Sequence, residues 1–587
     1  MTITFGCLVG FVAWFLVRYL IAGLYTVNQN ERAVKTSFGR AQRVGQLTTS
    51  DDPIAESLTP DEKERYVYPQ VRVILPGGPY FKDLGRLVIG WMTLFLFTGT
   101  PIHGSDWPQY RGPSHDGSSP ERILKTWPTG GPRLLWKKSL PDGFGSWVVG
   151  QGRAYTAVKR RIDGTAMDVF VALDADTGAE LWARAVGASA PGGGSGEGDG
   201  PRSTPVVDGD FVYVMNSYVS LLCLNASDGS VVWQRDLLQE FGGHGPDFQA
   251  GASPLVVGDL ILVTGPAGGT GQKLFGIHKR DGHTVWEGPN AVLTHSTPVV
   301  TTLLGVRQAL FFTGGGVVSV VPESGQELWR YTFTVSIPTA IAPVVAGDIV
   351  YHSAAYGTGA RAARIVQSGT TFRATEIWRK RGELINFWST PIYYQGHLYG
   401  LYGQDYGVSA PLKCVELATG TEKWSQPGFG PGQVLLVDGT ILLLTADGKL
   451  VLVEPNATAY TELARCQVLS GKCWNVPAIS RGRLYARSTK EGVCLDVSVP
   501  PPPPLRILSP ARNPDGGFQF RLTCTDGSTL TPERLGRVEI LASPALGVSP
   551  TIWTPLSNAS VSADATVAIP PPDRSVPHRY WMVREPQ

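Results

Sequence analysis

Short runs of alternating apolar and polar residues recur along most of the chain, and each run starts with a similar opening. A typical opening is Ser203–Tyr213, in which Ser-Thr-Pro precedes two valines, an Asp-Gly turn and a second run that ends in Tyr. Such alternation is typical of half-buried β-strands, and a Gly-containing turn between two runs predicts a hairpin. Eight such openings begin at Ser146, Ser203, Ser253, Ser296, Ala342, Ser389, Gln433 and Pro477.

A tryptophan follows most openings at the end of a second predicted hairpin. In Leu173–Trp182, Leu224–Trp233 and Val415–Trp424, a short polar turn ends in Gly, and the Trp stands four residues after it. We expect this Trp on the outermost strand of each unit, where its large flat ring covers the gap to the neighbouring unit. The unit near Glu462 has lost its Trp.

The units recur roughly every 45 residues, which is the period of a β-propeller blade. No Trp strand follows the last opening, whereas an additional Trp strand, Leu134–Leu140, stands before the first opening. We expect this strand to complete the last unit, because closing the ring removes exposed sheet edges. The sequence therefore predicts an all-β fold with an eight-bladed β-propeller over residues 105–499.

The repeated Thr-Gly-x-x-x-Trp turn resembles that of the pyrroloquinoline-quinone-like (PQQ-like, quinoprotein alcohol dehydrogenase-like) β-propeller superfamily. Asp106–Gly117, which reads Asp-Trp-Pro-Gln-Tyr-Arg-Gly-Pro-Ser-His-Asp-Gly, is similar to the opening of secreted bacterial members. What the resemblance implies is a fold, since the superfamily includes both quinoprotein dehydrogenases and non-enzymatic propellers of envelope assembly. Another all-β repeat, such as a WD-type or kelch propeller, is the alternative.

The first hundred residues have a different pattern. Ile3–Val27 is apolar except for Arg18, which predicts a transmembrane helix over residues 1–27. Residues 28–83 resemble a truncated band 7 (SPFH, stomatin/prohibitin-like) segment, on the basis of Tyr25–Ala41 and Tyr68–Phe81. Proteins of that family scaffold membrane microdomains, so a membrane scaffold is one functional hypothesis.

A second apolar segment, Leu87–Thr100, follows the basic residues Lys82 and Arg86 and precedes small residues. This order resembles a secretion signal, so residues 84–104 are predicted to form a second transmembrane or signal-like segment. The loop over residues 28–86 carries nine basic side chains. Basic loops stay in the cytoplasm, so we expect the propeller on the periplasmic or extracytoplasmic side of the membrane.

Five prolines, Pro500–Pro504, mark a linker that would extend as a stiff spacer. Beyond it, alternating runs such as Phe518–Thr523, Arg537–Ser543 and Arg579–Arg584 predict short strands. We expect a small β-sandwich over residues 505–587.

Composition removes several function classes. A net charge of +2 gives no electrostatic basis for binding nucleic acid. The seven cysteines include no Cys-x-x-Cys pair, so a thiolate metal site is not expected. Cys466 and Cys473 flank a short loop, and Cys473 or Cys494 could pair with a neighbour or stay buried as a free thiol.

Ligand sites of propellers lie where the loops at one mouth of the channel converge. Polar and aromatic residues near the opening strands are therefore the candidates. We select Arg202, His244, His295, Trp388 and Asp405 as candidate ligand residues, and each of them could also be an ordinary loop residue.

The sequence favours binding over catalysis. Quinoprotein dehydrogenases need carboxylates at the quinone and at Ca²⁺, and many have two adjacent cysteines, which this chain lacks. Nucleophile-elbow, zinc-protease and P-loop motifs are missing as well. The leading hypothesis is a membrane-tethered, exported propeller that binds protein or carbohydrate without a cofactor, a metal or a catalytic residue. The alternatives are a PQQ-dependent oxidoreductase with Ca²⁺ and a band 7-type membrane scaffold.

Overall fold

The computed structural model describes residues 106–189, 200–335, 339–403, 410–543, 553–556, 558–571 and 580–585, together with short strands between residues 24 and 81. The chain divides into two compact units, Met1–Pro101 and Ile102–Gln587. In the first unit, β1 (Leu24–Thr26) pairs with β6 (Pro79–Phe81), β2 (Ala33–Val34) with β5 (Val73–Ile74), and β3 (Thr36–Ser37) with β4 (Arg40–Ala41).

Within the described ranges, the structure contains no helix that is long and apolar enough to span a bilayer. The segments predicted as membrane spans, 1–27 and 84–104, lie outside the described residues except for Leu24–Thr26. These three residues pair as a strand with Pro79–Phe81. The prediction that the first helix continues to residue 27 is therefore wrong at its end, because the backbone there bonds to another strand.

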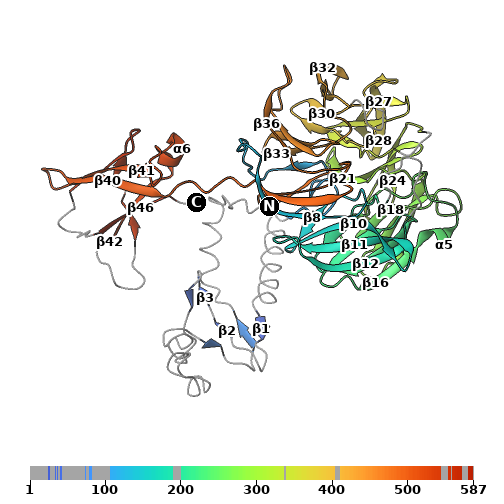
Figure 1. Cartoon of the computed structure of the whole chain (residues 1–587), viewed down its shortest axis with the longest axis horizontal. Coiled ribbons are helices and arrows are strands. Elements are labelled where there is room, and N and C mark those ends of the chain that lie inside the picture. Colours follow the sequence, from blue (N-terminus) through green and yellow to red (C-terminus); the bar gives the residue numbers. More distant parts are fainter. Residues whose placement is uncertain are drawn as a thin grey trace, which may run out of the picture. The chain divides into compact units, whose positions relative to one another are not determined.

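Eight sheets follow one another in the second unit; each contains four antiparallel strands, and one of them has a fifth, parallel strand (Figure 1). We number them one to eight along the chain. Sheet one contains β9 (Val148–Gly150), β10 (Arg153–Ile162), β11 (Thr165–Asp174) and β12 (Glu180–Ala188), and sheet two contains β13 (Val206–Asp208), β14 (Phe211–Met215), β15 (Ser220–Asn225) and β16 (Val231–Asp236). Sheet three contains β17 (Leu255–Val257), β18 (Leu260–Thr264), β19 (Lys273–His278) and β20 (Thr284–Asn290), and sheet four contains β21 (Val299–Leu303), β22 (Val306–Thr313), β23 (Gly316–Val320) and β24 (Glu327–Thr332).

Sheet five contains β25 (Val344–Ala346), β26 (Ile349–Ala354), β27 (Gly359–Ser368) and β28 (Thr371–Lys380). Sheet six contains β29 (Ile392–Tyr394), β30 (His397–Leu401), β31 (Leu412–Glu416) and β32 (Thr421–Gln426), and sheet seven contains β33 (Gln433–Val437), β34 (Thr440–Leu444), β35 (Lys449–Val453) and β36 (Glu462–Gln467). A two-residue strand, β7 (Ser118–Ser119), joins sheet seven in parallel with β33. A short helix, α5 (Leu237–Phe241), follows sheet two.

Sheet eight joins the two ends of the repeat region. Its first three strands are β37 (Ala478–Ser480), β38 (Arg483–Arg487) and β39 (Glu491–Asp496). The fourth is β8 (Arg133–Ser139), which pairs antiparallel with β39 so that Trp136 lies opposite Cys494. The predicted pairing of the N-terminal Trp strand with the last repeat is therefore confirmed.

In six of the eight sheets the Trp of the outer strand fastens the sheet to the next one, whereas Trp329 of sheet four donates to Gln308 of its own sheet. Trp136 donates from Nε1 to the Ala175 carbonyl of sheet one (3.0 Å), and its ring covers Gly178 so closely that a Cβ there would lie 2.7 Å away. Gly178 has φ +68°, so its turn also needs a residue without a side chain. Equivalent bonds run from Trp182 to Ala226, Trp233 to Lys279, Trp286 to Pro322, Trp378 to Leu417 and Trp424 to Asn456.

The Ser and Thr residues of the openings link the inner strands. In each link, a backbone N–H donates to the hydroxyl oxygen of the next sheet, and the closing link from Val476 to Ser146 measures 2.9 Å. The other four measure 3.0 Å and run from Ser146 to Thr204, Thr204 to Ser253, Ser253 to Thr297 and Ala342 to Thr390. The hydroxyl residues therefore recur in the sequence because they bond between sheets.

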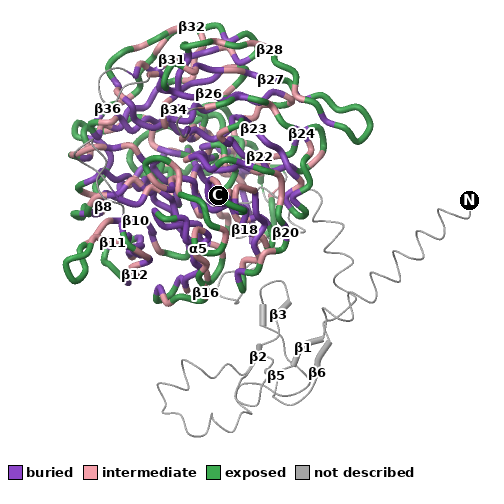
Figure 2. Tube along the Cα trace, turned by 90° about the vertical axis from the view of Figure 1, so that its right-hand side faces the viewer, coloured by how far each residue is buried: buried purple, intermediate pink, exposed green. Residues whose placement is uncertain are grey.

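Most residues of the three inner strands of each sheet are buried, while most residues of the outer strands are exposed or half-buried (Figure 2). The cores are shared between neighbours. One cluster combines Phe170 and Trp182 of sheet one with Val214 and Leu222 of sheet two. A single sheet would leave half of such a core exposed, so the sheets stabilise one another.

A segment that we call the strap, residues 106–125, crosses the ends of the inner strands. It bonds to sheets one, two, seven and eight through Trp107 with Val149, Pro108 with Val207, Gly117 with Leu436, Ser119 with Asp438, and Leu124 with Val497. The carboxylate of Glu121 is buried and accepts from the backbone N–H groups of Arg481 and Gly482 in sheet eight.

The C-terminal residues form two further antiparallel sheets. One sheet contains β40 (Leu505–Arg512), β41 (Phe518–Cys524), β45 (Thr566–Ile569) and β44 (Ser560–Val561). The other contains β43 (Thr554–Pro555), β42 (Glu539–Ser543) and β46 (Tyr580–Arg584), and helix α6 (Pro532–Gly536) connects β41 to β42. Phe520 and Val567 of the first sheet and Ile540 of the second belong to one hydrophobic core. A shared core between two sheets is the arrangement that the alternating sequence predicts.

Candidate functional site

One position precedes the inner strand of every sheet: it lies two residues before the donor of the hydroxyl link in the five sheets that have this link, and at the aligned residue of the repeat in the other three. We call these eight positions the mouth positions. They are Phe144, Arg202, Gly251, His295, Ala340, Trp388, Gly432 and Trp474. The backbone of the strap bonds to Val149 and Val207 within inner strands and to Asp438 just after one, whereas the mouth positions precede the first residues of these strands. The mouth therefore lies at the end of the inner strands opposite the strap.

Aromatic side chains gather on one side of this mouth. Trp388 and Trp474 have ring centroids 4.1 Å apart, and Trp474 stacks on Phe144 at 5.0 Å with an angle of 16° between the planes. The row continues from Trp388 to Phe387 at 4.1 Å and from Phe387 to Tyr356 at 5.5 Å. We call these five residues the aromatic arc.

The arc depends on sheet seven. Its mouth position is Gly432, where a Cβ would collide with the Leu444 carbonyl oxygen of β34, so this position requires glycine. The next residue, Gln433, is buried and donates from Nε2 to the carbonyls of Trp388 (3.3 Å) and Trp474 (2.7 Å). Trp388 also donates from Nε1 to the Pro431 carbonyl at 2.8 Å. These bonds fix both tryptophans in the orientation that brings their rings together.

Two cations lie over the faces of the arc. The ammonium of Lys472 is 4.4 Å from the centre of the Trp474 ring, and the guanidinium of Arg202 is 5.4 Å from the centre of the Phe144 ring. Aromatic faces carry negative potential, so both contacts are favourable. Trp388, Trp474 and Phe144 are all half-buried, so each presents part of its ring at the surface.

The other side of the mouth is polar. His295 is half-buried, and its Nε2 has no hydrogen-bond partner among the described residues. Burial, together with the charge of Arg202, lowers the pKa of His295 to about 4, so its imidazole is neutral at pH 7. Gly251, the mouth position of sheet three, makes room for it, because a Cβ there would lie 3.0 Å from the His295 side chain.

A buried carboxylate, Asp168, lies close enough to Arg202 to feel its charge. Asp168 on β11 is fully buried and accepts from the Ser217 backbone N–H at 2.8 Å. Burial raises the pKa of Asp168, while the hydrogen bonds from Ser217 and Ser189 and the charge of Arg202 oppose that rise. The sequence signal for this residue is an acidic side chain within an otherwise apolar strand, which we did not use.

Three of the five residues selected from sequence, Arg202, His295 and Trp388, occupy mouth positions. His244 does not, because it bridges to Ala267 through two backbone bonds of 2.8 and 2.9 Å in an exposed loop after α5. Asp405 lies outside the described residues. The sequence analysis missed Phe144, Trp474 and Lys472, although the spacing from the Ser/Thr links would have identified the first two. The ligand role of all these residues remains a prediction.

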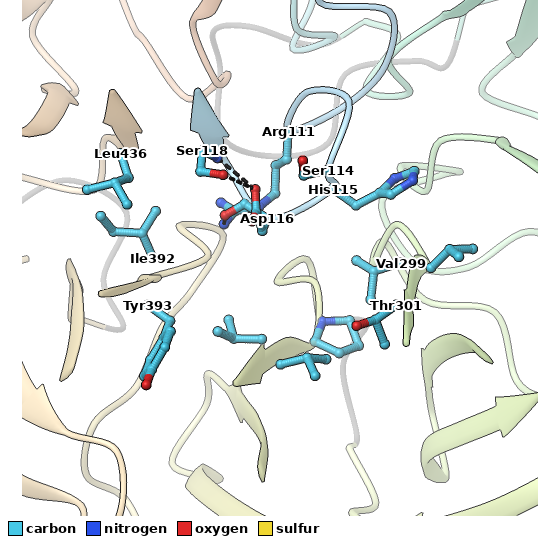
Figure 3. A pocket seen from close by; sticks show the side chains of 14 residues that line it. Arg111, Ser114, His115, Asp116, Ser118, Val299, Thr301, Ile392, Tyr393 and Leu436 are labelled. Atoms are coloured by element: carbon cyan, nitrogen blue, oxygen red, sulfur yellow. Dashed lines mark hydrogen bonds between the residues drawn. The ribbon is translucent and has the colours of Figure 1, made fainter. Parts of the chain in front are cut away.

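The opposite end of the inner strands contains a cavity of about 140 Å³ between the strap and sheets four to seven (Figure 3). Arg111 is buried there and donates to the carbonyls of Thr390 (3.1 Å), Pro391 (3.3 Å) and Asp116 (2.6 Å). The Asp116 carboxylate accepts from Ser118 at 2.8 Å. These polar groups are engaged in holding the strap, so we assign the cavity a structural role.

Among the residues that the structure describes, one group of three or more His, Cys, Asp or Glu side chains is close enough to share a metal ion, and it lies on a turn of sheet three. The six described cysteines, Cys223, Cys414, Cys466, Cys473, Cys494 and Cys524, are buried free thiols, so the disulfide alternative for Cys473 and Cys494 is not realised.

Residues 165–426 match the PQQ_2 family, described as outer membrane protein assembly factor BamB. A comparison with curated proteins found no match. Nothing in these comparisons supports the band 7 resemblance of residues 28–83.

Among solved structures, BamB from Moraxella catarrhalis is 14% identical with a TM-score of 0.44, and the match covers 62% of this chain and 97% of that one. Quinohemoprotein alcohol dehydrogenase from Comamonas testosteroni is 13% identical with a TM-score of 0.47, covering 70% of this chain and 83% of that one. Similarities this low do not decide between the two activities. The family match covers less than half of the chain, and it shows that residues 165–426 carry PQQ-like propeller repeats.

Proposed function

We propose that this chain is an exported, non-catalytic scaffold propeller that binds a protein partner at the aromatic arc. The observation that carries the proposal is the row of Tyr356, Phe387, Trp388, Trp474 and Phe144 with cations over two of its rings. Trp, Tyr and Arg supply most of the binding energy in protein interfaces, because they bury large rigid surfaces with a polar end. The family description, which names an assembly factor for outer membrane proteins, supports a protein partner.

The ring that presents the arc is, in this proposal, an eight-bladed propeller. Eight four-stranded sheets, the Val476–Ser146 link and the Trp136–Ala175 bond support a closed ring. A closed ring holds the mouth positions of all eight sheets around one opening. The proposed scaffold works without PQQ or Ca²⁺, since the described mouth residues offer no carboxylate cluster to hold the ion.

Photo-crosslinking in cells tests the partner. A photoreactive amino acid placed at Trp388 or Trp474 should give discrete crosslinks to protein, whereas the same group at Tyr393, a 39% exposed aromatic at the strap end, should give none. Trp388→Ala and Trp474→Ala should each weaken binding of the captured protein at least tenfold, as expected when a central aromatic anchor is truncated.

The competing outcome is carbohydrate binding. If no protein crosslinks to the mouth, and an oligosaccharide array instead shows binding that Trp388→Ala abolishes, the ligand is a glycan. Reduction of a dye that requires added PQQ and Ca²⁺ would replace the scaffold proposal by an oxidoreductase.

We also propose a membrane tether, with a segment before Leu24 or residues 84–104 as the anchor and the propeller on the extracytoplasmic side. A reporter fused after residue 587 should be active only outside the cytoplasm, and one fused near residue 60 only inside it, because basic loops remain cytoplasmic. Activity of the C-terminal fusion in the cytoplasm would contradict this orientation.

A further inference from the structure

The turn between β19 and β20 of sheet three carries three side chains of metal-binding type. His278, Asp281 and His283 each offer one ligand atom, and these atoms all lie within 4.8 Å of one another. Asp281 Oδ1 is 2.8 Å from His278 Nδ1 and 2.6 Å from His283 Nδ1. The two imidazole rings face each other with centroids 4.9 Å apart and an angle of 33° between their planes.

The turn is held in place from two sides. The His278 backbone N–H donates to the His283 carbonyl at 2.8 Å, and the Gly282 N–H donates to the His278 carbonyl at 2.9 Å. Trp233 of sheet two donates to the Lys279 carbonyl at 3.0 Å and covers Gly282. A ligand set on such a turn is preorganised, so binding of an ion requires little ordering of the backbone.

The fold does not need these histidines. The equivalent turn of sheet two has Asn225 and Ser230 at their positions, and Asn225 Nδ2 donates to Ser230 Oγ at 2.7 Å. The central acidic residue is shared, since Asp228 accepts from Ser230 in sheet two as Asp281 accepts from His283 in sheet three. The turn of sheet two closes without histidine, so His278 and His283, two of the nine histidines of the chain, are not required to close the turn of sheet three.

The charges of the turn also suit a cation. Asp281 contributes a carboxylate that lies within hydrogen-bond distance of both imidazoles. The neighbouring ammonium of Lys279 is paired with Asp208 at 2.7 Å, which reduces its repulsion of a bound ion. The side chains of Asp281 and His283 are 59% and 60% exposed and hence accessible.

We propose that His278, Asp281 and His283 form a surface site for a divalent transition-metal ion such as Zn²⁺. Two imidazole nitrogens and a carboxylate oxygen are a common protein donor set for Zn²⁺, and three ligands leave a fourth position open for water or for a side chain of another molecule. The site is independent of the aromatic arc and of the function proposed for it.

Calorimetric titration of the full-length chain with ZnCl₂ tests the site. We expect one tight equivalent per chain, and we expect the double variant His278→Asn with His283→Ser to lose at least tenfold in affinity. This variant reproduces the closed turn of sheet two, so its circular dichroism and melting temperature should not change. His397→Ala, on a turn of sheet six, is the matched control and should bind Zn²⁺ as the unaltered chain does.

Replacement of Zn²⁺ by Co²⁺ gives a second readout, because four-coordinate Co²⁺ in the site absorbs visible light much more strongly than the hydrated ion, and the double variant should lack these bands. Unchanged Zn²⁺ affinity in the double variant would place the ion elsewhere and overturn the proposal. Equal affinity for Ca²⁺, which prefers oxygen ligands, would also overturn it.

Discussion

Replacing Trp136 by Ala should destabilise the propeller by about 3–5 kcal/mol, the usual cost of truncating a buried Trp or Phe. Trp136 is 5% exposed, packs edge-on against Trp147 at 6.0 Å, and donates to the Ala175 carbonyl. Its strand comes from the N-terminal end of the repeat region, but its partners belong to sheets eight and one. The variant therefore removes the side chain that fastens the last sheet to the first.

Chemical unfolding followed by far-UV circular dichroism measures the loss, and hydrogen exchange should show that amides of β8 and β39 lose protection first. Leu134→Ala is the control on the same strand, because Leu134 is 52% exposed and such surface changes usually stay within about 0.5 kcal/mol. A loss below about 1 kcal/mol in Trp136→Ala would mean that the ring is held closed by other contacts.

The sheets and their closure could be predicted because the repeat encodes local features. A Gly with positive φ, such as Gly178, and a Trp four residues later specify a hairpin without reference to the rest of the chain. One Trp strand stands before the first opening, and the last repeat is the one that ends without a Trp strand and has a free position for it. The long-range pairing of these two segments could therefore be predicted.

The aromatic arc could not be predicted in the same way. It joins Trp388 of sheet six to Trp474 of sheet eight, and no periodicity in a single sequence indicates that these two rings meet across sheet seven. The strap posed a similar difficulty. Arg111 reaches the carbonyls of Thr390 and Pro391, some 280 residues away, through bonds that no periodicity encodes.

Acidification should destabilise the protein below about pH 6.5, and His352 should account for a measurable part of the loss. His352 lies on β26 with no exposed surface, and the rings of Phe312, Tyr331 and Phe333 surround it edge-on at 4.6–5.4 Å. Neither ring nitrogen has a partner among the described residues. Burial, with a smaller effect from the charge of Arg361, lowers the pKa of His352 to about 3.

The direction follows from proton binding. An unfolded chain takes up the His352 proton near pH 6.5, while the folded chain takes it up only near pH 3, so the unfolded state binds more protons between these values. The stabilising contribution is complete above pH 6.5 and declines as the pH falls, by about 1.4 kcal/mol per pH unit well below 6.5. His295 and His115, whose pKa values are lowered to about 4, act in the same direction.

The test compares the free energy of unfolding at pH 7.0 and pH 5.0 for the unaltered chain and for His352→Phe, which keeps an aromatic ring in the cage but cannot be protonated. We expect the unaltered chain to lose about 2 kcal/mol more than the variant over this interval. His352→Leu provides a smaller replacement if Phe overfills the site, and His244→Gln, in an exposed loop, should behave like the unaltered chain. Equal losses in the unaltered chain and both His352 variants would show that His352 is protonated in the folded protein at pH 5.0, and that its cage admits a charge.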